Sequence, residues 1–76
     1  MNRSPVKSSN ITSIGYDTES EILEVEFSGA RVYRYYDVPA DLHAELMLAE
    51  SHGSFLYENI SCRIGGPLFE YEKISH

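Results

Sequence analysis

Residues 31–39 read Arg-Val-Tyr-Arg-Tyr-Tyr-Asp-Val-Pro, and the rest of the chain is organised around this segment. It holds three of the six tyrosines and two of the six basic residues. The residues before it alternate as strands do, whereas those after Pro39 have the spacing of a helix. Runs of strands followed by runs of helices indicate an α+β domain. We therefore predict an antiparallel sheet of three to four strands with two helices packed on one face.

The clearest strand covers residues 22–27, where Leu, Val and Phe alternate with two glutamates. That alternation is typical of an antiparallel strand with one apolar face and one wet face. Residues 28–30 then form a loop, in which Gly29 can supply the positive φ that a hairpin needs. The segment therefore predicts a hairpin whose second strand begins at Arg31.

The parity of the two strands fixes the register of this hairpin. A two-residue loop would place the charge of Arg34 beside the apolar Val25. A three-residue loop instead sets Tyr33 across from Val25 and Arg34 across from Glu24. We therefore predict the three-residue loop, with Tyr33 and Tyr35 in the core and a Glu24–Arg34 ion pair on the wet face.

The remaining elements are read from shorter patterns. Residues 1–8 are polar and contain an early proline, so we expect a loose N-terminal segment. A first strand is expected at 9–16, helices at 39–50 and 54–61, and a final edge strand around 68–71. Together, residues 9–74 are expected to form a single domain.

The spacing of apolar residues orients the first helix. Leu42, Leu46 and Ala49 lie at i, i+4 and i+7, so they should face the sheet. Gly53 is expected to end this helix, and Ser54 to cap the second one.

Composition limits the classes of protein that this chain can belong to. Its 76 residues are 42% hydrophobic and 24% charged, which are ordinary values for one small globular domain. No apolar run is long enough for a membrane span, and the N-terminus lacks the apolar stretch of a signal peptide, so we expect a cytoplasmic protein. The formal net charge of −6 disfavours a strongly basic nucleic-acid binder.

No catalytic or metal-binding constellation is visible in the sequence. Cys62 is the only cysteine, and His43, His52 and His76 show no metal-ligand spacing. We expect His43 on the solvent side of the first helix and His52 in the turn between the helices. Neither histidine has a partner for acid–base chemistry that the sequence can place. We therefore predict no enzymatic activity, no cofactor and no metal.

An ordered set of residues resembles the pattern of a known family. The set runs Ser8-Ser9-x-Ile11, Ile14-Gly15-Tyr16-Asp17, Leu23-Glu24-Val25-x-Phe27, Gly29, Tyr33-Arg34-Tyr35, Val38-Pro39 and Ala49-x-Ser51-x-Gly53-x-Phe55 with Ile60. It resembles the KTSC domain, which occurs alone in bacteria and at the C-terminus of some lysyl-tRNA synthetases. The Tyr-x-Tyr of that family maps onto Tyr33 and Tyr35. The resemblance implies a binding module, with RNA as the ligand that its attachment to synthetases suggests.

Two functions follow from these observations. The first is a small non-enzymatic module that contacts RNA through the few basic or exposed aromatic residues near the hairpin, namely Arg31, Arg34, Tyr36 and Arg63. The alternative is a protein-interaction module or inhibitor that presents an acidic surface to a basic partner. Tyr36, beside Arg34 on the wet face, fits a nucleic-acid contact, a protein contact or simple surface packing.

Overall fold

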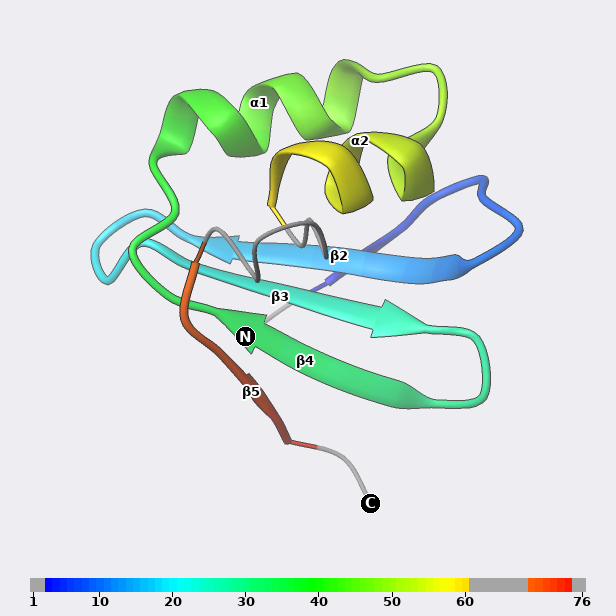
Figure 1. Cartoon of the computed structure of the whole chain (residues 1–76), viewed down its shortest axis with the longest axis horizontal. Coiled ribbons are helices and arrows are strands. Elements are labelled where there is room, and N and C mark those ends of the chain that lie inside the picture. The colour runs from blue at the N-terminus through cyan, green and yellow to red at the C-terminus, as the bar shows by residue number, and fades with distance from the viewer. Residues whose placement is uncertain (1–2, 61–68, 75–76) are drawn as a thin grey trace.

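The structure is a computed structural model that describes residues 3–60 and 69–74. Five strands form one antiparallel sheet in the order β1-β2-β3-β4-β5, and two helices lie on one of its faces (Figure 1). This arrangement confirms the α+β prediction. The elements are β1 (Ser4–Pro5), β2 (Ile11–Asp17), β3 (Ile22–Phe27), β4 (Arg31–Tyr35), α1 (Ala40–Leu48), α2 (His52–Asn59) and β5 (Tyr71–Lys73).

The β3–β4 hairpin has the predicted three-residue loop and the predicted register. Val25 pairs with Tyr33, and Glu24 pairs with Arg34. Gly29 takes a φ of 84°, the left-handed conformation that glycine adopts without steric cost. Ala30 follows with a φ of 61°, so the loop uses two consecutive left-handed residues. The hairpin thereby places the odd-numbered residues of β4 on the helix side of the sheet.

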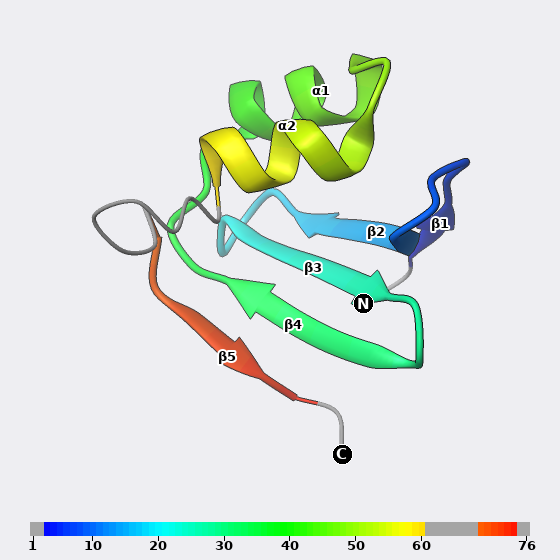
Figure 2. The ribbon, with the colours of Figure 1, turned by 45° about the vertical axis from the view of Figure 1, so that its right-hand side comes forward.

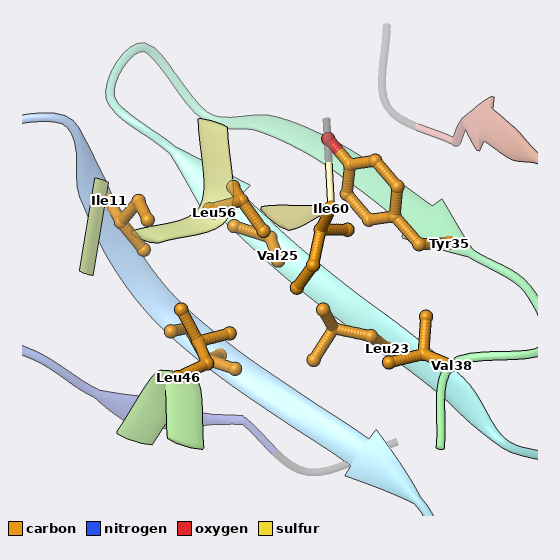
Figure 3. Packing of buried hydrophobic residues seen from close by; sticks show 9 residues of the cluster. Ile11, Leu23, Val25, Tyr35, Val38, Leu46, Leu56 and Ile60 are labelled. Carbon is orange, nitrogen blue, oxygen red and sulfur yellow. The ribbon is translucent and has the colours of Figure 1, made fainter. Parts of the chain in front are cut away.

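The core lies between the helices and the three strands β2, β3 and β4. Leu46 of α1 and Leu56 of α2 are buried, as is Ile60, which follows α2. Their side chains meet residues of β2, β3 and β4 (Figure 3). The buried apolar cluster consists of Ile11, Ile14, Leu23, Val25, Tyr35, Val38, Leu46, Leu56 and Ile60. Leu42 also packs against it, as predicted, whereas Leu48 is 86% exposed.

The N-terminal segment contains a short strand that the sequence pattern did not predict. Ser4 and Pro5 form β1 and pair antiparallel with Ile14 and Ser13 of β2. The Arg3 side chain, which alternation of local sequence could not place, forms ion pairs with glutamates of β3. These contacts are all long-range, and the local sequence has no strand pattern that could have predicted them.

The boundaries of both helices differ from the expected ones. Pro39 is the N-cap of α1, and α2 begins at His52 instead of residue 54. Ser51, not Ser54, caps α2, because its hydroxyl accepts a hydrogen bond from the Ser54 N–H. Gly53 is therefore a helical residue and does not end α1; a Cβ there would lie 3.6 Å from Asn10, an ordinary van der Waals distance, so the packing of α2 near the chain leading into β2 does not require glycine at this position.

A final edge strand was expected around 68–71; β5 is an element of that kind but covers Tyr71–Lys73, and residue 68 lies outside the described residues. β5 is an edge strand that pairs Tyr71 with Tyr35 and Lys73 with Tyr33. All three of its residues are exposed. No described helix is long and apolar enough to cross a membrane.

Candidate functional site

The sheet separates the predicted site residues onto two faces. Arg34 and Tyr36 lie on the face that no helix covers, together with Glu24. Arg31 lies on the helix side of the sheet, near the β3–β4 loop. It is three residues from Arg34 along the strand, and side chains an odd number of residues apart point to opposite faces. Arg63 lies outside the described residues. The structure therefore unites two of the four predicted residues and separates Arg31 from them.

The uncovered face is dominated by a charge network of Arg3, Ser13, Glu24, Glu26 and Arg34. Arg34 Nε donates to Glu24 Oε1 at 2.9 Å, and Arg3 Nη1 pairs with the other oxygen of the same carboxylate. Arg3 Nε donates to Ser13 Oγ at 3.0 Å, and Ser13 in turn donates to Glu26. Both arginines are thus held by carboxylates of the same molecule.

Glu24 does not lie on a wet face, contrary to the sequence-based prediction. It is only 3% exposed, since the arginines on either side cover it. Burial favours the neutral acid, but hydrogen bonds from Arg34 and Arg3 outweigh that effect and hold the pKa of Glu24 below its ordinary value. The network is therefore an ionised structural unit, in which the positive charges of Arg3 and Arg34 are neutralised by the neighbouring carboxylates.

Tyr36 is also committed to a partner on the uncovered face. Its hydroxyl donates to Glu72 of β5 at 3.0 Å, which raises the pKa of the hydroxyl. Its backbone N–H donates to the Glu70 carbonyl at 2.8 Å. These bonds join β5 to the end of β4, and they place a carboxylate beside the ring where an RNA phosphate would have to approach.

A different group of side chains lies on the helix side of β4 and β5. Both views show α1 and α2 above β2 and β3, while β4 and β5 extend beyond them (Figures 1 and 2). There the Tyr33 ring lies 5.6 Å from Phe27 in an edge-to-face contact and 6.1 Å from Tyr71. Tyr71 is 52% exposed. We call this surface the aromatic patch, and it consists of Phe27, Arg31, Tyr33, Tyr71 and Lys73.

Two cations flank the rings of the aromatic patch. Lys73 is directly across from Tyr33, and Arg31 is two residues from Tyr33 along β4, on the same face. Both cations are exposed, and within the described part of the chain neither forms a salt bridge. Arg31 Nε donates a hydrogen bond to the Ser28 carbonyl at 3.1 Å, and no carboxylate of the described residues pairs with its terminal nitrogens. Aromatic rings and available cations thus occur side by side on this surface.

Half of the acidic residues gather at the opposite end of the sheet from the β3–β4 loop. The Val38 N–H donates to the Glu21 carbonyl, and the Tyr36 N–H donates to the Glu70 carbonyl, which joins three acidic segments. Glu21 and Asp37 both have φ values near +60°, a strained backbone region for residues other than glycine. We call this surface the acidic end, and its residues are Asp17, Glu19, Glu21, Asp37, Asp41 and Glu70.

The two described histidines form no catalytic arrangement. His43 is half-buried and stacks on Tyr16 at 4.5 Å between ring centroids, so its predicted place on the solvent side was wrong. Burial lowers the pKa of His43. His52 is the first residue of α2 and does not lie in a turn. Among the described residues, no group of three His, Cys, Asp or Glu side chains is placed to hold a metal.

Sequence reasoning missed Arg3, Tyr71 and Lys73 as members of these surfaces. Arg3 carries no local signal, because its partners are at least ten residues away. Tyr71 and Lys73 alternate about Glu72, which is a strand signal, but the neighbouring strand of β5 could not be deduced from it. Tyr33 and Tyr35 were expected in the core; Tyr35 is 3% exposed, whereas Tyr33 is only partly buried.

The sequence and the fold are both similar to known proteins. The family model of the KTSC domain matches residues 7–63. A protein of Tsukamurella paurometabola is 44% identical over 52 residues, which cover 68% of this chain and 78% of that relative. An uncharacterized protein of Stutzerimonas stutzeri is 47% identical over 53 residues, which cover 70% and 75%. The crystal structure of a KTSC domain protein from Yersinia pestis has a TM-score of 0.86 and 38% identity, over 97% of each chain.

Proposed function

Because this chain belongs to the KTSC domain family, we propose that it is a non-enzymatic module that binds single-stranded RNA through the aromatic patch. The observation that carries the proposal is the placement of two cations, Arg31 and Lys73, beside the rings of Tyr33 and Tyr71; within the described residues neither cation forms a salt bridge. Proteins that bind single strands combine these two features, since bases stack on aromatic rings and phosphates pair with basic groups.

The arrangement of charge supports this surface over the uncovered face. Arg3 and Arg34 would have to leave the buried Glu24 in order to bind phosphate, and that would leave a carboxylate desolvated without its partners. Within the described part of the chain, Arg31 and Lys73 have no carboxylate partner that they would have to leave. The net charge of −6 opposes binding at long range, but the acidic end lies away from both cations. A local patch on an acidic chain can therefore attract RNA at short range.

Fluorescence anisotropy with a labelled octauridine tests the proposal. If two cations neutralise two phosphates, the affinity should fall about sevenfold between about 50 mM and about 200 mM salt, from a slope of about −0.7 per phosphate. Arg31→Glu combined with Lys73→Glu should abolish binding. Lys7→Glu is the control for Lys73→Glu, because Lys7 is an exposed lysine at the opposite edge of the sheet.

Two results would contradict the proposal. One is the absence of any anisotropy change at about 50 mM salt, where phosphate contacts are strongest. The other is equal weakening by Lys7→Glu and Lys73→Glu, which would show a response to net charge without a defined site. Far-ultraviolet circular dichroism of each variant must match that of the unchanged protein.

A second function is favoured by the acidic end. Glu21 and Asp37 keep left-handed backbones that cost about 1–3 kcal/mol each, and such strain often accompanies functional sites. The partner would be a protein with a basic surface. Capture of one protein from a lysate, unaffected by nuclease and lost on Glu21→Lys with Asp37→Lys, would support this function. Recovery that disappears with nuclease would exclude it.

A further inference from the structure

The aromatic patch offers few rings on which a base can stack. Tyr71 is 52% exposed and Tyr33 is partly buried, but Tyr35 is only 3% exposed. The ring of Tyr35 lies 5.9 Å from that of Tyr71 and is covered by the core. Phe27 is half-buried and meets Tyr33 edge to face at 82°. The surface therefore has room for about two stacked bases, one on Tyr71 and one on Tyr33.

The charges around these rings are unequally distributed along the strands. Arg31 and Lys73 lie toward the hairpin loop, whereas Glu70 directly precedes Tyr71, and Asp37 lies two residues beyond Tyr35. Both carboxylates are exposed. A phosphate is thus attracted on one side of the rings and repelled on the other. From Arg31 to Tyr35 the strand spans only about 13 Å, at about 3.3 Å per residue.

We infer that the aromatic patch binds an unpaired stretch of about two to three nucleotides, and that the acidic end sets its limit. This inference rests on the proposed function, because it describes the ligand of the same surface. Among the described residues, a strand longer than this stretch has no further cation to contact beyond Tyr35, and it meets the carboxylates of Asp37 and Glu70 there. The ligand class is therefore a short unpaired segment of RNA, such as a loop or a terminal overhang, and not an extended single strand.

A series of oligouridines of two, three, four and eight nucleotides tests this inference. Affinity is measured by competition against the labelled octauridine. It is then divided by the number of positions along each oligonucleotide at which the site could bind. The affinity per position should rise to three nucleotides and then stay constant within about twofold. A continued rise of tenfold or more from three to eight nucleotides would overturn the inference while leaving the proposed function intact.

The second measurement uses a variant in which the two carboxylates that limit the site are neutralised. Asp37→Asn with Glu70→Gln removes two charges, and asparagine tolerates the left-handed backbone of Asp37. The octamer should bind about threefold more tightly, as expected for charges partly screened at about 10 Å, and the dimer should be unchanged. Glu45→Gln with Glu50→Gln is the matched control for net charge. Equal gains from both pairs of substitutions would overturn the assigned limit, and no binding by any oligonucleotide would overturn the proposed function as well.

Discussion

Arg34 and Arg31 lie three residues apart on one strand, yet they belong to surfaces of opposite character. Arg34 is on the uncovered face, where Glu24 holds its Nε at 2.9 Å. Arg31 is on the helix side, where the described residues offer it a backbone carbonyl and no carboxylate. An arginine is therefore available to a ligand only if the fold places no carboxylate partner beside it. Residue type and proximity in sequence do not reveal this.

The largest effect is expected from breaking the charge network. Arg3→Gln with Arg34→Gln leaves Glu24 buried without its ionic partners, so unfolding in urea should show a loss of about 3 kcal/mol. Affinity for octauridine should not change, because neither arginine belongs to the aromatic patch. A variant that stays as stable as the unchanged protein but loses RNA affinity would reverse the roles assigned to the two surfaces.

The aromatic patch should respond in the opposite way. Tyr71→Ala removes an exposed ring, and it should weaken binding of octauridine about tenfold, with little change in the urea midpoint. Tyr36→Ala is the matched control, since this tyrosine lies on the uncovered face and bonds to Glu72. If Tyr36→Ala weakens binding more than Tyr71→Ala does, the RNA lies on the uncovered face.

Acid should weaken the charge network on the uncovered face. The pKa of Glu24 is lower in the folded state than in the unfolded chain, so its contribution to stability is present above the ordinary carboxyl pKa and is lost as the pH falls through the folded value. Urea midpoints measured from neutral pH down to strongly acidic pH should therefore fall. Glu24→Gln should flatten this fall, whereas Glu26→Gln, a more exposed neighbour, should leave most of it.

His43 should give the smallest effect, at milder pH. Burial lowers its pKa, so the unfolded chain binds a proton more readily than the folded protein does. Stability should fall as the pH drops through about 6.5, the value expected for an unfolded histidine. His43→Phe keeps a ring against Tyr16 and should remove this dependence between pH 7 and pH 6, as followed by thermal unfolding. A dependence that persists in the variant would assign the effect to another group.

Local pattern predicted the centre of the fold well. Alternation in residues 22–27 and the parity argument gave the pairing of Val25 with Tyr33 and of Glu24 with Arg34. These succeeded because the side-chain period of a strand is two, so a slip of one residue would exchange the buried and exposed faces. The helix starts failed by one or two residues, since a proline and several serines near each start could all serve as caps.

The candidate site was predicted only in part for a different reason. The sequence predicts the pairing of Arg34 with Glu24, but the burial of Glu24 also depends on Arg3, which comes from the β1 edge of the sheet. Likewise Lys73 comes to lie across from Tyr33 only through the pairing of β5 with β4. Contacts over 20 to 40 residues leave no trace in local periodicity.

The sequence by itself determined the α+β class, the central hairpin and its register, because these follow from alternation and loop length over a few residues. Only the tertiary structure decided which charges are compensated. It brought two arginines onto one buried carboxylate, and it placed Arg31 and Lys73 beside the partly buried ring of Tyr33 and the exposed ring of Tyr71. The physical reason is that burial and ion pairing depend on which strands become neighbours, and this order is fixed by the packing of the whole chain.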